Sequence, residues 1–237
     1  MSRYPVTVSG DSTTPMGAAG APAPVDLIAH RGFADDAAEN TLPALRDAAG
    51  SADAVEFDVR RSGSEHLVVC HDETVDRVTD SAGPLRTFTA TELGAMDVLN
   101  SGTGIPTLES VLDALPATTV HVELKERGLA ADAVRRLDAY DGEVVVSAFD
   151  PDVLATVSDL VDVPLAYLGR DPDIDVAAEL GCSYVHPERT AVDASFVERA
   201  HGAGLEVNAW TVKSRAEAER LRAAGVDGLI ADSAGVM

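Results

Sequence analysis

Three apolar runs within residues 26–72 each stop at a group of polar residues that can do chemistry. Leu27-Ile28-Ala29 leads into His30-Arg31-Gly32, Ala54-Val55 leads into Glu56-Phe57-Asp58, and Leu67-Val68-Val69-Cys70 leads into His71-Asp72. In proteins built on a parallel sheet, ligands collect at the ends of the strands. This segment therefore predicts strand ends that carry two histidines, an arginine and a carboxylate pair, a set suited to an anion held beside a hard metal ion.

The rest of the chain repeats the alternation of short β-rich runs with longer helical patterns. The expected strands are Asp26–Ala29, Ala54–Val59, Val120–Leu124, Glu143–Ala148, Pro164–Leu168, Ser183–His186, Glu206–Val212 and Gly228–Ala231. The expected helices are Leu42–Ala49, Leu108–Ala114, Leu129–Ala139, Pro151–Val157, Ile174–Leu180, Ala194–Ala203 and Ser214–Ala224. This order favours an α/β fold with a closed (β/α)8 barrel over an open doubly wound sheet, for which no glycine-rich dinucleotide fingerprint is present.

Two helix starts carry local capping signals. Asn40 or Thr41 can cap the helix that begins at Leu42, and Ser214 has Glu217 at the spacing of a capping box. We therefore expect side-chain caps at both helices.

One connection is too long for an ordinary loop. Between Val59 and Pro106 the pattern predicts a hairpin-like piece at Leu67–Cys70 and a short helix at Thr91–Met96. Long loops on barrels are usually functional, and His71 lies on this one. We expect a small insertion after strand 2, spanning about residues 60–106.

The charge of the chain is extreme. Forty acidic residues face eighteen basic ones, for a formal net charge of −22, and the only lysines are Lys125 and Lys213. A lysine-poor acidic surface stays hydrated when salt screens its charges, which favours a salt-loving host over an ordinary acidic protein. No basic stripe exists, so nucleic acid is excluded as an expected partner.

The cysteines, the N-terminal residues and the hydropathy of the chain indicate the same cellular compartment. Cys70 and Cys182 lie in apolar surroundings without paired spacing, which predicts free buried thiols in a reducing compartment. Residues 1–24 lack a signal-peptide profile and are expected to form a flexible tail. With no apolar run long enough for a membrane span, we expect a cytoplasmic protein without stable membrane association; its oligomeric state is left open.

Three carboxylates form the first candidate site. Glu56 and Asp58 are two residues apart on a predicted strand, so they share a face, and Glu123 sits in similar apolar surroundings on the next barrel strand. Hard oxygen ligands without cysteine indicate Mg²⁺ or Ca²⁺ rather than Zn²⁺. A buried salt bridge to Arg60 or Lys125 is the equal alternative.

Histidine and arginine residues form the second candidate site. Arg31 fits the oxygen fork of a phosphate, and imidazoles at His30 and His71 can act as general base and general acid. Of the other histidines, His121 is expected deeper in the barrel as a hydrogen bonder, and His186 is expected at the pocket wall.

Two further residues have both a functional and an ordinary interpretation. Lys125, in a chain that otherwise uses arginine, fits a phosphate contact or an exposed strand-end side chain. Trp210, the only tryptophan, is either a core aromatic or a platform for the carbon skeleton of a ligand.

The ordered set of motifs resembles the glycerophosphodiester phosphodiesterase family. The matching pieces are His30-Arg31-Gly32 with Glu39-Asn40-Thr41-Leu42, Glu56-Phe57-Asp58-Val59, His71-Asp72-Glu73-Thr74-Val75-Asp76-Arg77, Ile105-Pro106-Thr107-Leu108-Glu109, Val122-Glu123-Leu124-Lys125, Asn208-Ala209-Trp210-Thr211-Val212 and Gly225-Val226-Asp227-Gly228-Leu229-Ile230-Ala231-Asp232. Each piece alone is weak, but the set keeps its order from Asp26 to the C-terminus.

The resemblance implies a TIM barrel with an insertion after strand 2 and hydrolysis of a glycerophosphodiester to glycerol phosphate and an alcohol. It implies roles for the individual residues: Glu56, Asp58 and Glu123 as ligands of one divalent metal ion, Ca²⁺ or Mg²⁺; His30 and His71 as the acid–base pair; Arg31 and Lys125 as phosphate ligands. Glu39 is expected to orient the His30-Arg31 segment. The alternatives are a non-catalytic ligand-binding barrel and a phospholipase D-like lipid phosphodiesterase.

Overall fold

The computed structural model describes residues 24–237, so the expected tail at 1–24 lies almost wholly outside the described part. Eight parallel strands form a ring in which β1 pairs with both β9 and β2, which closes the barrel. These strands are β1 (Asp26–His30), β2 (Ala54–Arg61), β4 (Thr119–Leu124), β5 (Val144–Ala148), β6 (Leu165–Gly169), β7 (Tyr184–Pro187), β8 (Glu206–Val212) and β9 (Gly228–Ala231). The (β/α)8 prediction is confirmed.

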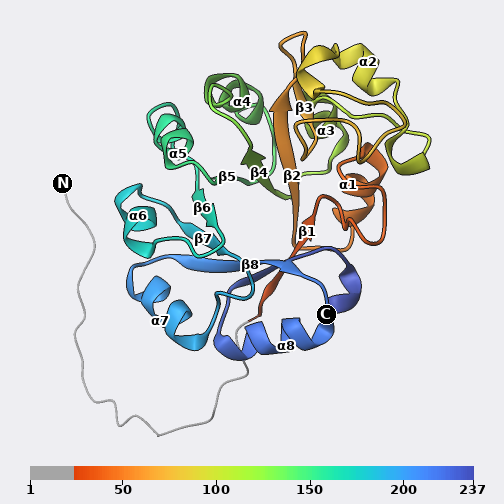
Figure 1. Ribbon diagram of the computed structural model, residues 1–237. Coiled ribbons are helices and arrows are strands. Elements are labelled where there is room, and N and C mark those ends of the chain that lie inside the picture. The colour runs from red at the N-terminus through yellow and green to blue at the C-terminus, as the bar shows by residue number, and fades with distance from the viewer. Residues whose placement is uncertain (1–23) are drawn as a thin grey trace, which may run out of the picture.

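Helices cover the outside of the ring (Figure 1). They are α1 (Leu42–Ala48), α3 (Leu108–Ala114), α4 (Ala130–Leu137), α5 (Pro151–Ser158), α6 (Ile174–Glu179), α7 (Ala194–Gly202) and α8 (Arg215–Ala224), and the 3-10 helix η3 (Ala234–Val236) follows β9. The main hydrophobic core lies between strands and helices, where side chains such as Leu45, Phe57 and Leu229 are fully buried. No helix within residues 24–237 has the length and apolar character needed to cross a bilayer.

The insertion after β2 is a small unit with its own core. It contains β3 (Leu67–Val69), which pairs antiparallel with β2, followed by η1 (Leu85–Thr87), α2 (Ala90–Gly94) and η2 (Val98–Asn100). Leu67 and Val69 of β3 join the barrel core. The other buried apolar side chains of the insertion form a separate cluster: Val68, Cys70, Val75, Val78, Leu85, Leu93, Val98 and Ile105. It lies on one side of the ring, beyond β2 (Figure 1). Both cysteines are free and buried, as expected.

Of the two predicted side-chain caps, the one at Ser214 is confirmed and the one at Asn40 or Thr41 is wrong. Thr41 precedes α1, but its hydroxyl donates to the carbonyl of Ala38 at 2.8 Å instead of accepting from the helix. One reason is that Pro43, at the second helical position, has no N–H to donate. At α8, Ser214 accepts from the amide of Glu217, but the Glu217 carboxylate accepts from the amide of Lys213, so the reciprocal half of the capping box is absent.

The strand register sets up the chemistry at the centre of the barrel. Residue pairs aligned across neighbouring strands are His30 with Glu56, Glu56 with His121, and Asp58 with Glu123. Polar side chains from three strands therefore point into the same interior layers.

Two histidines fill the interior below those carboxylates. The rings of His121 and His186 lie 5.4 Å apart, and the Asn208 side-chain amide donates to His186 Nε2 at 3.2 Å. Burial lowers the pKa of His186 well below its usual range, and the neighbouring His121 lowers it further. His186 lines the pocket, as expected, but Nδ1 of His121 is buried without a partner, so the hydrogen-bonding role expected for His121 is not seen at that atom.

Acid should destabilise the protein partly through His186. The unfolded chain binds a proton on this imidazole near its ordinary pKa, whereas the folded chain does not, so the folded state loses stability as the pH falls through about 6.5. The slope for one such group approaches about 1.4 kcal/mol per pH unit. Urea unfolding as a function of pH should therefore show that the free energy of unfolding falls less steeply with acid in His186→Gln than in wild type. The exposed His66→Gln variant is the control and should follow wild type. If the His186→Gln curve also runs parallel to that of wild type, His186 is not a source of the acid sensitivity.

Candidate active site

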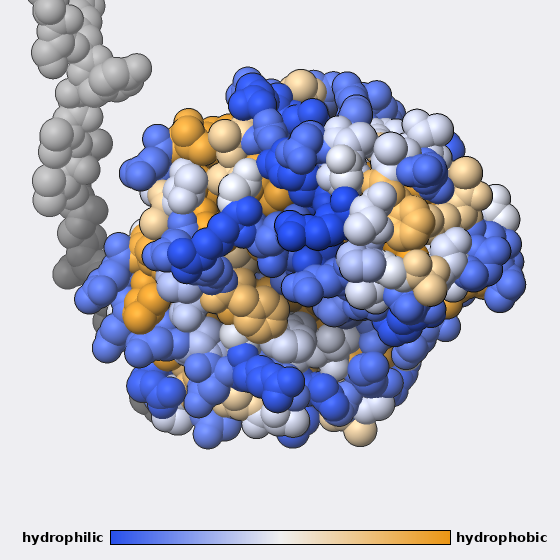
Figure 2. Space-filling model, turned by 45° about the horizontal axis from the view of Figure 1, so that its top comes forward, coloured by the Kyte–Doolittle hydropathy of each residue, from blue (hydrophilic) through white to orange (hydrophobic). Residues whose placement is uncertain are grey.

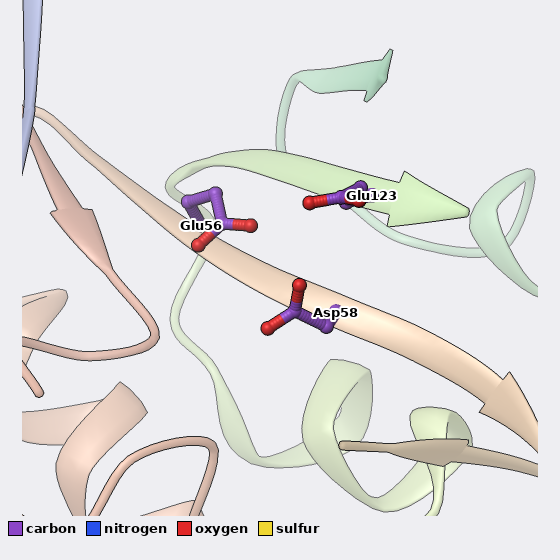
Figure 3. A group of neighbouring side chains, drawn as sticks. All are labelled: Glu56, Asp58 and Glu123. Carbon is purple, nitrogen blue, oxygen red and sulfur yellow. The ribbon is translucent and has the colours of Figure 1, made fainter. Parts of the chain in front are cut away.

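The three predicted carboxylates converge at the carboxyl ends of β2 and β4. Glu56 and Asp58 project from β2 and Glu123 projects from β4, with their carboxylates turned toward one another (Figure 3). One oxygen from each group lies within 4.8 Å of the others, and all three residues are buried. Two carboxylates face alike because they are two residues apart, and the third joins them because Asp58 and Glu123 are register partners.

These like charges change one another's protonation. Burial raises the pKa of Glu56 well above its usual range, and the charges of Asp58 and Glu123 add to the effect. Burial, followed by the charge of Asp58, raises the pKa of Glu123 to about 7. Burial also opposes ionisation of Asp58, but Arg31 and Lys125 outweigh it and hold its pKa below the usual range.

Both predicted phosphate ligands pair with the carboxylates. Lys125 Nζ lies 2.7 Å from Glu123 Oε1 and 3.3 Å from Asp58 Oδ1. Arg31 Nε lies 3.2 Å from Asp58 Oδ2, and its NH1 donates to Glu39 Oε1 at 3.0 Å. The salt-bridge alternative therefore holds for Lys125. It does not hold for Arg60, whose Nε instead donates to the carbonyl of His71 at 2.8 Å.

The two histidines are oriented in the same manner. His30 Nδ1 lies 2.5 Å from Asp232 Oδ1, and His71 Nδ1 lies 2.6 Å from Asp72 Oδ1. A carboxylate at Nδ1 fixes the ring and directs the Nε2 atom away from the partner. Burial lowers the pKa of His71, against the opposing charge of Asp58.

One cavity of about 280 Å³ joins these groups. It is lined by the predicted residues His30, Arg31, Glu56, His71, Glu123, Lys125 and Trp210, while Asp58 is fully buried. Part of the lining is apolar, and the rings of Phe149 and Trp210 meet there edge to face with centroids 5.8 Å apart. Hydrophilic residues dominate the face of the molecule shown in Figure 2, with smaller apolar patches among them.

Sequence reasoning missed several residues around this cavity. Asp232 follows β9 directly, so the strand-end rule applied to the first strands would have found it. Phe149 and Arg170 likewise follow β5 and β6 and line the cavity. Arg77 does not follow a barrel strand, so the strand-end rule does not find it; it lies in the insertion and pairs with Glu39 on the barrel.

Comparisons with known proteins agree with this geometry. The profile of the glycerophosphoryl diester phosphodiesterase family matches residues 30–236. A glycerophosphodiester phosphodiesterase of Caldanaerobacter subterraneus is 31% identical over 226 residues, covering 87% of this chain and 93% of that protein. A glycerophosphodiester phosphodiesterase of Bacillus altitudinis is 30% identical over 230 residues, covering 87% and 94%.

Solved structures give the same picture. An Oleispira antarctica phosphodiesterase in complex with the product sn-glycerol-3-phosphate superposes with a TM-score of 0.82 at 27% identity, covering 87% of this chain and 92% of that one. A glycerophosphodiester phosphodiesterase of Thermotoga maritima gives a TM-score of 0.76 at 27% identity, covering 89% and 95%.

Asn40 should stabilise the acidic cluster through a hydrogen bond to Asp58. Its side chain donates to Asp58 Oδ2 at 2.9 Å, and its backbone has a φ of 59°, a conformation that asparagine tolerates better than most residues. We predict that Asn40→Ala lowers the free energy of unfolding by about 1–3 kcal/mol, because a buried carboxylate loses a donor and the backbone is strained. Urea unfolding measures the change. Asn100→Ala, at an exposed residue with a φ of 60°, isolates the backbone contribution; equal losses in the two variants would show that the Asp58 contact contributes nothing.

Proposed function

The chain belongs to the glycerophosphoryl diester phosphodiesterase family, whose members are phosphoric diester hydrolases, and we propose that it hydrolyses glycerophosphodiesters to glycerol phosphate and an alcohol with the help of one divalent metal ion. The observation that carries the proposal is the convergence of Glu56, Asp58 and Glu123 beside a cavity that two carboxylate-bound histidines line. Glycerol phosphate as the product is also what the Oleispira antarctica structure contains.

The acidic cluster fits a metal ion on three counts. Asp58 Oδ1 is buried and accepts no hydrogen bond, although Lys125 lies at ion-pair distance. Within residues 24–237, no lysine or arginine side chain lies at ion-pair distance from Glu56, whose side chain is 6% exposed. The donor set is all oxygen, which suits Ca²⁺ or Mg²⁺. When bound, such an ion supplies positive charge that polarises the phosphoryl oxygens and lowers the pKa of a coordinated hydroxyl.

The two histidines are proposed to divide the proton transfers. One imidazole Nε2 takes a proton from the attacking hydroxyl or water, and the other gives a proton to the leaving alkoxide. Asp232 behind His30 and Asp72 behind His71 hold the rings for this and stabilise the charged form that each ring passes through.

Arg31 and Lys125 are proposed to bind the phosphate. Both side chains line the cavity. Arg31 is paired with Asp58 and Lys125 with Glu123, so both positive groups are held in place before substrate arrives. Trp210 and Phe149 offer an apolar wall for the carbon skeleton of the substrate. In a chain of net charge −22, these cations also offset the field that would repel an anionic substrate.

Turnover should depend on a divalent ion. We expect purified protein in molar KCl, chosen because of the acidic surface, to release glycerol phosphate from glycerophosphocholine or glycerophosphoethanolamine with Ca²⁺ or Mg²⁺. A chelator should abolish release, and returning the ion should restore it. Release that persists in full after the ion is removed would sink the metal requirement, and folded protein that cuts neither diester with either ion would contradict the activity on these substrates.

Loss of either catalytic imidazole should reduce turnover strongly while the fold survives. His30→Ala and His71→Ala are each expected to lower kcat by about 10²–10⁴-fold, the usual range for general acid–base groups. Circular dichroism and the melting temperature check folding, and exposed His66→Ala serves as the matched control. Wild-type kcat in either cavity variant would remove that histidine from the mechanism.

A further inference from the structure

His71 reaches the cavity from the insertion, just after β3. Leu67 and Val69 of β3 join the barrel core, whereas Cys70, next to His71, belongs to the separate apolar cluster of the insertion. Apolar packing therefore anchors the strand before His71, but it does not orient the ring against groups on β1, β2 and β4. Arg60, on β2, fixes the backbone by donating to the His71 carbonyl at 2.8 Å. That contact does not orient the imidazole ring.

A second arginine connects the ring to the barrel. Arg77, in the insertion, donates from Nε to Asp72 Oδ2 at 2.5 Å, and the other oxygen of Asp72 lies 2.6 Å from His71 Nδ1. The far side of Arg77 donates to both oxygens of Glu39 at 2.6 and 2.8 Å. Glu39 precedes α1 in the barrel and also accepts from Arg31. A continuous chain of charge-assisted hydrogen bonds thus runs from the barrel to His71.

The geometry requires an arginine. Nε serves Asp72 while the two terminal nitrogens bind Glu39 as a fork, so one planar group fixes two carboxylates at once. A lysine ammonium at this position is a point charge without that planar arrangement. Arg77 does not line the cavity, and its side chain is 48% exposed, so its contribution to overall stability is expected to be small.

We propose that Arg77 is a positioning residue: it docks the insertion on Glu39 and, through Asp72, holds the His71 ring with Nδ1 toward Asp72 and Nε2 toward the substrate. The inference rests on the proposed function for its kinetic consequence, but the orientation of the ring can be observed without any turnover. Small displacements of a catalytic group are costly, so losing this link acts on the chemical step more than on substrate binding.

The test compares Arg77→Ala and Arg77→Lys with Arg86→Ala, which removes an exposed arginine from the same insertion. Both Arg77 variants are expected to lower kcat by about 10–100-fold with KM changed less than about threefold, whereas Arg86→Ala keeps wild-type values. Guanidinium added to Arg77→Ala should restore part of kcat and have no such effect on Arg77→Lys. Melting temperatures should stay close to that of wild type.

The ring itself is read by nitrogen NMR, with the His71 signals assigned by their loss in His71→Gln. Wild type should show a neutral ring protonated at Nδ1, and Arg77→Ala should show a mixture of tautomers. An unchanged ring signal in Arg77→Ala would overturn the proposal, and so would a wild-type kcat. If wild type cleaves no diester, the proposed function fails by itself, and the ring signals alone decide the role of Arg77.

Discussion

The rest of the site depends on keeping three carboxylates together inside the barrel. At 4.8 Å, two such charges repel by about 3 kcal/mol at the effective dielectric constant typical of protein sites. Arg31, Lys125 and the amide of Asn40 stabilise Asp58 and Glu123, but Glu56 has no comparable side-chain cation among the described residues. This imbalance favours a function over a purely structural ion pair, because a buried charge cluster without full compensation costs stability.

The same arrangement explains why the histidines come with their own carboxylates. Burial lowers the pKa of His71, and the charges of Arg31 and Lys125 lower it further, while the hydrogen bond to Asp72 opposes the shift. Asp232 and Asp72 each hold an imidazole ring through its Nδ1 atom. For His30 the carboxylate comes from the barrel itself. For His71 it comes from the insertion, so the insertion must be docked before the site is complete.

Periodicity and strand ends predicted the fold and most of the site, because both follow from local patterns. The alternation around Ala54–Val59 places Glu56 and Asp58 on one face whatever the rest of the chain does. The strand-end rule could have placed Asp232 at the site, but not its pairing with His30, which is 202 residues away and depends on closure of the ring. The Thr41 cap is wrong for a local reason: Pro43 removes one of the two amides that it could bind, and the hydroxyl donates to the Ala38 carbonyl instead. The Arg77 link depends on how the insertion packs against the segment before α1, which no local pattern encodes.

Calorimetric titration of Ca²⁺ and of Mg²⁺ into wild type and Glu56→Gln tests whether the three carboxylates bind a divalent ion. Glu56 is the informative position because neutralising it leaves the Arg31 and Lys125 ion pairs in place. We predict one ion bound per chain of wild type, and binding weakened roughly tenfold or more in the variant because one charged ligand is lost. Absence of binding to folded wild type, or equal affinity in both proteins, would contradict it.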